Sequence, residues 1–583
     1  MRRYLFIALI ALPVLALELT NRRGFFPTEL KALAPKPEKI ALKAKIIDIT
    51  EKSGLHFTHE VLRPTIQGIE HIKGWVLGSG ATVSVSDVDL DGYQDVYFTS
   101  MELGKNNKLF RNQGDGTFRN ETQKFFKWPT NRTWISLKPT FFDCDNDGDQ
   151  DLFLNTSSCP VLYKNDGGKG FTDWTSEAGL SVCHTVNGNV VDMNNDGLLD
   201  LTYASYNIYS ADHQMDNFMN ADRGIQFQAM FKNKGECRFE KVENTGIEDV
   251  GLTHAIGVLD VRGIDRKDLW FVTDVGTDRL FLDNGDGTYT NRSDLLAWAF
   301  NRHGMSFDVS YDEDATRPHV SVSHVFAPSF VVEGNALWHL DEKESMANVA
   351  RERGVAECGH AWGSKFFDLD FDGDEEQLVI NGFVSKNPKK DYLFPLALLG
   401  QTHRGYMKFA KNWPKMNDAS LYGYQKNCIF VREGNSYGVP AEENDFTNDV
   451  LDGRAIVTLD LLNNGRPAII VANQIQPAKI FQVEPDSGNH WLGLKLQGSC
   501  SNRDAFGSKI KVRAGGKNQT RWYYPSNGFS SQSESQLLIG LGKSDIIEEL
   551  VIRWPRGFEE KFTNLSVNQY HKLKEGAGCA QQN

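Results

Sequence analysis

One short run of acidic residues has the composition and spacing of a metal-binding loop. In residues 143–151, carboxylates stand at the first, third, fifth and ninth positions, and Gly148 is the sixth residue. With the backbone carbonyl of position seven, these groups would place hard oxygen donors around one cation, as in calcium loops. Position twelve is Leu154 instead of the glutamate of an EF-hand, and short apolar runs replace the two flanking helices. We expect a calcium loop that leads into a β-strand.

The same pattern occurs four times with a complete set of donors, at residues 87–95, 143–151, 192–200 and 368–376. We predict one calcium ion in each loop, with a structural role, because a bound cation holds the loop closed. Without a cation, the crowded carboxylates would repel one another. The predicted ligands, which bind through side chains except at position seven, are Asp87, Asp89, Asp91, Tyr93, Asp95, Asp143, Asp145, Asp147, Asp149, Asp151, Asp192, Asn194, Asp196, Leu198, Asp200, Asp368, Asp370, Asp372, Asp374 and Glu376.

Three further copies of the loop have lost donors. They begin at Asp260, Asp308 and Asp460. We expect these copies to bind no metal. In the first of them, the guanidinium of Arg262 occupies position three and would replace the cation.

A second phrase recurs between the loops and predicts hairpins. It begins at Leu109, Leu162, Phe231 and Leu280, and it contains an Asn-Gly or Asp-Gly type of turn between two strands. Loop, strand and hairpin together predict a four-stranded antiparallel sheet, which cannot bury both of its faces alone. Stacking the copies in a ring solves that problem, and seven loop starts predict an all-β, seven-bladed β-propeller. The long gap before the last copy predicts a large surface excursion.

The chain of 583 residues is too long for one hydrophobic core. Its net charge of −13 resides largely in the acidic loops, where calcium would neutralise it, and it offers no basic footprint for nucleic acid. Eight cysteines suit an oxidising compartment and leave 105 possible pairings open.

The first residues have the features of an export signal. A basic start precedes a short apolar run, so residues 1–19 are either a cleaved signal peptide or an uncleaved membrane anchor. Residues 20–44 are rich in Lys, Ala and Pro and predict a linker. We therefore expect an exported protein, secreted, periplasmic or on the cell surface, with a possible N-terminal membrane tether.

The repeats resemble the FG-GAP (VCBS) repeats of integrin-type propellers. The tail is similar to the ASPIC/UnbV domain, whose pattern is followed by residues 502–508, 528–532, 539–542 and 552–557. Together the two parts resemble the cartilage acidic protein family over about residues 45–575. The resemblance implies a propeller over 45–486, a small β-sandwich-like domain over 487–576 and a tail over 577–583. Arg503 and Asp504 are not needed for packing a short turn, so we expect them to lock that turn or to contact the propeller or a partner.

No linear motif indicates an enzyme. The sequence lacks a nucleophile elbow, a zinc-protease helix, a phosphate-binding loop and a dinucleotide fingerprint, and its histidines are scattered singly. Our hypothesis is a calcium-binding scaffold or adhesion module that binds an extracytoplasmic protein or glycan. The alternative is an enzyme whose residues converge from several blades on the central channel, because propellers host both classes.

Overall fold

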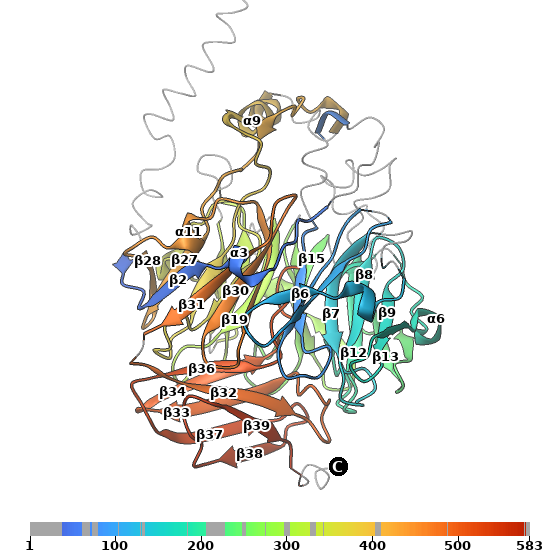
Figure 1. Cartoon of the computed structure of the whole chain (residues 1–583), viewed down its shortest axis with the longest axis vertical. Coiled ribbons are helices and arrows are strands. Elements are labelled where there is room, and N and C mark those ends of the chain that lie inside the picture. The colour runs from blue at the N-terminus through green and yellow to red at the C-terminus, as the bar shows by residue number, and fades with distance from the viewer. Residues whose placement is uncertain are drawn as a thin grey trace, which may run out of the picture.

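The structure is a computed structural model in which two β-rich parts stack on each other (Figure 1). Strands make up most of its regular elements and helices are short, which confirms the predicted all-β class. The described residues are 38–60, 70–72, 80–102, 104–128, 130, 135–183, 185–205, 228–247, 252–274, 276–296, 303–326, 334–341, 343–402, 410–486, 488–576 and 578.

Within these residues, seven sheets of four or five strands make up the larger part. The first three are β35-β3-β4-β5-β6 (Ser531–Gln532, Val83–Ser86, Asp95–Phe98, Lys108–Asn112, Phe118–Asn120), β7 to β10 (Ser136–Phe142, Asp151–Thr156, Val161–Asn165, Phe171–Asp173) and β11 to β14 (Thr185–Val191, Asp200–Ser205, Gln228–Asn233, Phe239–Val242). The next two are β15 to β18 (Thr253–Leu259, Asp268–Thr273, Arg279–Asp283, Tyr289–Asn291) and β19 to β22 (Gly304–Ser310, His319–His324, Ala336–Leu340, Met346–Asn348). The last two are β23-β24-β27-β28-β1 (Ser364–Phe367, Glu376–Val379, Cys428–Glu433, Ser436–Pro440, Lys39–Ile40) and β29-β30-β31-β2 (Gly453–Asp460, Pro467–Asn473, Lys479–Pro485, Ala44–Asp48).

The seven sheets form a closed ring. The first strand of each sheet packs against the first strand of the next, in the order β3, β7, β11, β15, β19, β23 and β29, and β29 packs back against β3. The N-terminal strand β2 completes the last sheet, where Ile46 pairs with Val483. Because each sheet has a neighbour on both faces, its central strands are buried on both faces, and all six residues of β8 and of β16 are buried. The outer strands, such as β10, are exposed beyond their first residue.

Several connections between the strands of the ring contain short helices, and one connection is a long excursion. The excursion joins β24 to β27, as the gap in the repeats predicted, and contains the parallel pair β25 and β26 (Asn387–Asp391, Ala419–Ser420) and helix α9 (Leu393–Thr402). The other helices are one turn long: α3 (Thr50–Ser53), α5 (Thr122–Phe125), α6 (Thr175–Ala178), α8 (Ala350–Arg353) and α11 (Asp445–Asn448). No helix of the described part is both long and apolar enough to cross a bilayer.

The C-terminal module contains two further sheets, as expected for a small sandwich. They are β36-β32-β39 (Leu537–Gly542, His490–Gln497, Tyr570–Lys574) and β34-β33-β37-β38 (Lys517–Tyr523, Ser508–Ala514, Ile547–Arg553, Glu559–Phe562). Its core residue Phe506 belongs to the same hydrophobic cluster as Phe231 of the propeller. The two parts therefore share one continuous core.

Two boundaries differ from the sequence prediction. Lys39 and Ile40 pair with β28, so the linker expected over 20–44 ends in strand structure. Ser531 of the C-terminal part pairs with Val83 of the propeller, so the boundary at residue 487 does not separate two independent units. The predicted signal or anchor over residues 1–19 and most of the tail over 577–583 lie outside the described residues.

Candidate functional site

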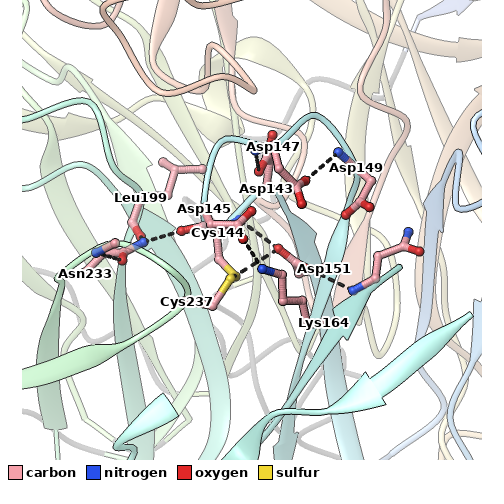
Figure 2. Close-up of a disulfide and its surroundings, with 12 residues drawn as sticks. Asp143, Cys144, Asp145, Asp147, Asp149, Asp151, Lys164, Leu199, Asn233 and Cys237 are labelled. Atoms are coloured by element: carbon pink, nitrogen blue, oxygen red, sulfur yellow. Dashed lines mark hydrogen bonds and ion pairs between the residues drawn. A yellow bond between two sulfur atoms is a disulfide. The ribbon is translucent and has the colours of Figure 1, made fainter. Parts of the chain in front are cut away.

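Each acidic loop joins the first and second strands of a sheet. In the second sheet, the loop after β7 closes on Asp143, whose carboxylate accepts hydrogen bonds from the N–H groups of Asp147 (3.0 Å) and Gly148 (2.8 Å) (Figure 2). Gly148 has φ of +105°, a left-handed conformation that costs glycine little. Asn146 at position four is also left-handed, with φ of 60°. This tight turn points the carboxylates of the loop inward.

In three of the four complete loops, the structure brings together the predicted side-chain ligands at positions one, three and nine, but not the carboxylate at position five. The grouped carboxylate oxygens lie within 4.8 Å of one another. In the loop at 192–200, position three is Asn194, whose amide donates to the carboxylate of Asp196 (2.9 Å). The three groups are Asp87 with Asp89 and Asp95, Asp143 with Asp145 and Asp151, and Asp368 with Asp370 and Glu376.

These groups have the properties that a hard cation requires. Asp87, Asp89, Asp145 and Asp368 each have a buried carboxylate oxygen without a hydrogen-bond partner. Burial raises the pKa of the carboxyl groups of Asp95, Asp143 and Asp151 to about 8. Several acidic groups in a low-dielectric site remain ionised only if positive charge is supplied, and oxygen donors with free lone pairs are the ligands that calcium prefers. The residues therefore fit the predicted ion.

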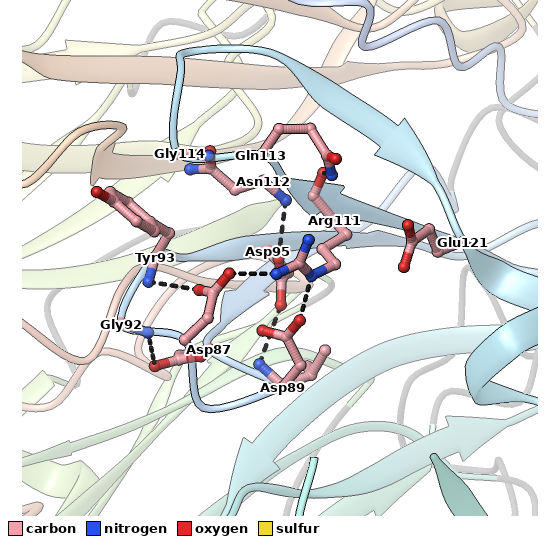
Figure 3. A network of polar contacts seen from close by, with 12 residues as sticks. Asp87, Asp89, Gly92, Tyr93, Asp95, Arg111, Asn112, Gln113, Gly114 and Glu121 are labelled. Carbon is pink, nitrogen blue, oxygen red and sulfur yellow. Dashed lines mark hydrogen bonds and ion pairs between the residues drawn. The ribbon is translucent and has the colours of Figure 1, made fainter. Parts of the chain in front are cut away.

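Basic side chains of the neighbouring hairpins reach two of the loops. Arg111 on β5 contacts Asp89 and Asp91 (Figure 3), and Lys164 on β9 contacts Asp145 (Figure 2). These ion pairs neutralise part of the loop charge from the side of the sheet. A cation in either loop would share the carboxylates with the basic side chain.

Position seven was predicted to bind through its carbonyl. The carboxylate of Asp149 accepts a hydrogen bond from the N–H of Gly167 in the next hairpin, at 2.8 Å. This side chain is thus engaged by the hairpin, while the backbone of position seven stays in the loop. The loop is also tied covalently, because Cys144 at position two forms a disulfide with Cys237 between β13 and β14.

In the first degenerate loop, protein cations occupy the position of the metal. Arg262, the residue expected to replace the cation, donates to the carboxylate of Asp268 (2.8 Å). Lys509, from β33 of the C-terminal module, donates to Asp260 (2.6 Å). Sequence reasoning missed Lys509 because 249 residues separate the two partners.

The degenerate copy at Asp308 was placed wrongly. Asp308 lies inside β19, where it pairs with Ser321, so the loop begins three residues later, at Tyr311. The repeated spacing of Asp308 and Asp312 imitated a loop start. Asp312 instead binds the guanidinium groups of Arg353 (2.7 Å) and Arg432 (2.8 Å).

The C-terminal module rests on the face that carries the acidic loops. The carboxylate of Asp504 accepts hydrogen bonds from the backbone N–H of Asp143 (2.8 Å) and from Gln150 (2.6 Å). A Cβ at Gly540 would lie 2.2 Å from a carboxylate oxygen of Asp368, so only glycine allows β36 to approach that loop. Of the roles considered for Arg503 and Asp504, contact with the propeller is the one observed.

A segment of the module also fills the central channel. Between β34 and β36, residues 524–536 run along the inner strands of the ring. Gln532 pairs with the N–H (2.7 Å) and carbonyl (2.8 Å) of Phe141 on β7, and Asn527 pairs with the N–H (3.0 Å) and carbonyl (3.1 Å) of Val258 on β15. Without this segment, the inner edge strands of the sheets would leave their unpaired backbone N–H and C=O groups to water. The segment is therefore an internal plug, which the sequence did not predict.

His254 and His360 are far apart in the sequence, but both lie near the tip of this plug. The ring of Phe529 lies 5.7 Å from His254 and 5.2 Å from Trp362, and His360 stacks on Trp362 at 5.5 Å. Burial lowers the pKa of His360 to about 3, so this histidine is neutral. These contacts are those of a packed core. Another histidine of the sequence, His184, lies outside the described residues.

Fold and loops together define a β-propeller protein with repeated acidic loops and a docked C-terminal β module. The chain contains FG-GAP-like repeats, matched over residues 87–154 and 143–202, and an ASPIC and UnbV domain, matched over residues 498–580. This is the architecture that the sequence motifs indicated.

Two solved structures match this chain at low identity. A protein of Agrocybe aegerita, described by its specific recognition of non-reducing terminal N-acetylglucosamine, is 10% identical, covers 79% of this chain and 100% of its own, and has a TM-score of 0.38. BBS1N in complex with ARL6DN is 8% identical, covers 77% and 99%, and has a TM-score of 0.39. No curated protein has a matching sequence.

Proposed function

We propose that this protein is an exported, calcium-binding propeller that acts as a scaffold or adhesion module for an extracytoplasmic protein or glycan. The observation that carries the proposal is the set of buried carboxylate oxygens without partners in the complete acidic loops. Calcium would satisfy these oxygens and hold each loop in the shape on which the C-terminal module rests. The three disulfides within the described residues suit an oxidising compartment.

In this proposal calcium organises the docking face. Asp143 is both a predicted ligand and a donor to Asp504, and Gly540 packs on the loop of Asp368. Ions that fix these two loops therefore also favour the docked position of the module and of its plug. By linkage, docking of the module must increase calcium affinity by the same factor.

The alternative, an enzyme with its active site in the central channel, has less support. Residues 524–536 occupy the channel and use the polar groups of its walls, such as Lys138, which donates to the carbonyl of Ser526 (2.9 Å). A substrate would have to displace this segment. Binding at an outer surface needs no such displacement.

Metal analysis of the full chain, purified without chelator, tests the calcium assignment. We expect four calcium ions per chain, and three in Asp145→Ala, which removes the side-chain oxygens at position three, where the loop at 192–200 keeps an oxygen donor in Asn194. The exposed Asp286, in a hairpin outside the acidic loops, gives the matched control Asp286→Ala, which should retain four. Wild-type protein without calcium would refute the assignment. The scaffold role is tested by binding of the full chain to glycan arrays and to native envelope proteins, with and without chelator; hydrolysis of a substrate by the full chain would favour the enzyme instead.

A further inference from the structure

The propeller has a second end, opposite the acidic loops. Each acidic loop joins the first strand of a sheet to the second, so connections from second to third strands lie at the other end, because neighbouring strands are antiparallel. The connections that enter each first strand reach the same end. Figure 1 shows helix α9 there, far from strands β32 and β36 of the C-terminal module.

Exposed apolar side chains gather at this end. Trp128 precedes β7 and is 68% exposed, Phe394 on α9 is 59% exposed, and Ile475 between β30 and β31 is 53% exposed. Leu398 and Tyr424 are exposed in the same excursion as Phe394. Of the nine large apolar residues that are exposed in the described part, five therefore lie in connections at this end. Three separate connections present them.

The local structure holds these side chains outward. In α9, Leu396 packs with Trp413 and Met416, which leaves Phe394 on the outer side of a helix that contains no charged residue. Ile475 has φ of 58°, a conformation that costs a β-branched residue energy. The glutamines on either side of Ile475 anchor the turn by accepting hydrogen bonds from the N–H groups of Ala81 (3.0 Å) and Asp452 (2.6 Å).

Basic residues accompany the apolar ones. The excursion, residues 384–426, contains eight Lys and Arg residues against two Asp residues, in a chain whose net charge is −13. Lys389 and Lys390 precede α9, and Lys415 follows it; all three are exposed. The acidic loops lie at the opposite end. The connection from β28 to β29 enters the same end as the excursion and is acidic, so the excess of basic residues belongs to the excursion itself; its acidic residues are Glu442, Glu443, Asp445, Asp449 and Asp452.

We propose that this end of the propeller binds the surface of an anionic phospholipid bilayer. Trp, Tyr and Phe are the side chains that favour the membrane interface, and lysines beside them attract acidic headgroups. Protruding side chains on three separate connections fit a flat and deformable surface. The proposal is independent of calcium, because no acidic loop belongs to this surface, and it leaves the C-terminal module turned away from the membrane.

Vesicle binding of the full chain, with calcium held constant, tests the proposal. The probes are vesicles of phosphatidylcholine alone and of phosphatidylcholine with phosphatidylserine. We expect co-sedimentation with the anionic vesicles that weakens with salt. The double variant Phe394→Asp/Leu398→Asp and the double variant Lys389→Glu/Lys390→Glu should each lose at least about tenfold in affinity.

Ile546, in the C-terminal module and 63% exposed, gives the matched control Ile546→Asp, which should bind like the wild type. Melting temperatures establish that every variant is folded. Absence of binding to either vesicle would overturn the proposal, as would equal binding to both or equal loss in Ile546→Asp. Capture of an envelope protein that is lost in Phe394→Asp/Leu398→Asp, without vesicle binding, would assign the surface to a protein partner instead.

Discussion

The backbone N–H of Asp143 donates a hydrogen bond to the carboxylate of Asp504, 361 residues further along the chain. One partner opens a predicted calcium loop, and the other lies in a turn of the C-terminal module. The contact is buried, so neither group has water as a substitute partner. It links the state of the loop to the position of the module.

Asp504→Ala should lower the stability of the folded chain and weaken calcium binding by the loop that begins at Asp143. Loss of the acceptor leaves the buried N–H of Asp143 without a partner, which costs about 1–3 kcal/mol of unfolding free energy. Calorimetric titration should also show weaker calcium binding, since loop and module are coupled. Asp504→Asn is the matched control, because its amide oxygen can still accept the bond. Unchanged melting and unchanged calcium binding in Asp504→Ala would contradict the coupling.

Removal of calcium should destabilise the whole chain. A ligand that binds only the folded state adds about 2.7 kcal/mol per site at a hundredfold excess over its dissociation constant. We expect excess EDTA to lower the melting temperature and to expose the junction between propeller and module to protease. Returned calcium should restore both. A melting temperature unaffected by long chelation would argue against a structural role for the ions.

Gly540→Val should separate the module from one loop. The new Cβ would lie 2.2 Å from a carboxylate oxygen of Asp368 and 2.5 Å from the backbone of Phe371, so one of the two segments must move. We expect loss of the ion at residues 368–376 and a lower melting temperature. Gly516 has φ of +78° with open space around it, and Gly516→Asn should be neutral because asparagine tolerates that conformation. Four retained ions in Gly540→Val would contradict this view of the contact.

The features that could be predicted from the sequence are those that depend on the local spacing of residues. The repeated loops and hairpins specified the strands, their order and the ring, because each repeat carries its own turn residues. The clustered carboxylates of the loops, such as that of Asp145, could be named for the same reason. The error at Asp308 has the same origin: an Asp at the right distance from Asp312 imitated a loop start, although strand pairing with Ser321 places it inside β19.

Long-range partners could not be predicted in this way. Lys509 replaces a cation at Asp260, and the plug of residues 524–536 has neither a strand period nor a hydrophobic pattern. One signal was present: Ser526, Asn527 and Gln532 are short polar side chains that can pair with the exposed edge of a strand. Their partners are set by the assembled ring, which a linear pattern does not contain.

Asn527→Ala tests the plug. Its amide accepts from the N–H of Val258 (3.0 Å) and donates to the carbonyl of the same residue (3.1 Å). Two buried backbone groups lose partners in the variant, so we expect a loss of about 2–5 kcal/mol in urea unfolding. The exposed Asn284 supplies the control Asn284→Ala, which should cost far less. Deletion of residues 488–583 should unfold the propeller as well; a stable, monomeric truncated ring would show that the plug does not close it.

Lys138 gives the plug a pH dependence of known sign. It is fully buried on β7, donates to the carbonyl of Ser526 (2.9 Å), and burial lowers its pKa to about 7 from the ordinary 10.5. Between these values the unfolded chain binds a proton that the folded protein does not, so stability rises with pH by up to about 1.4 kcal/mol per unit.

Lys138→Met removes this contribution and leaves the titration of the acidic loops in place. Urea unfolding with saturating calcium should therefore show that the wild type gains about 2 kcal/mol on the variant as the pH rises from about 7 to about 9. The exposed Lys389 supplies the control, and Lys389→Met should follow the wild type at every pH. If Lys138→Met also follows the wild type, the amine is charged and paired in the folded channel. The plug would then be held by an ion whose partner must be sought in the channel wall.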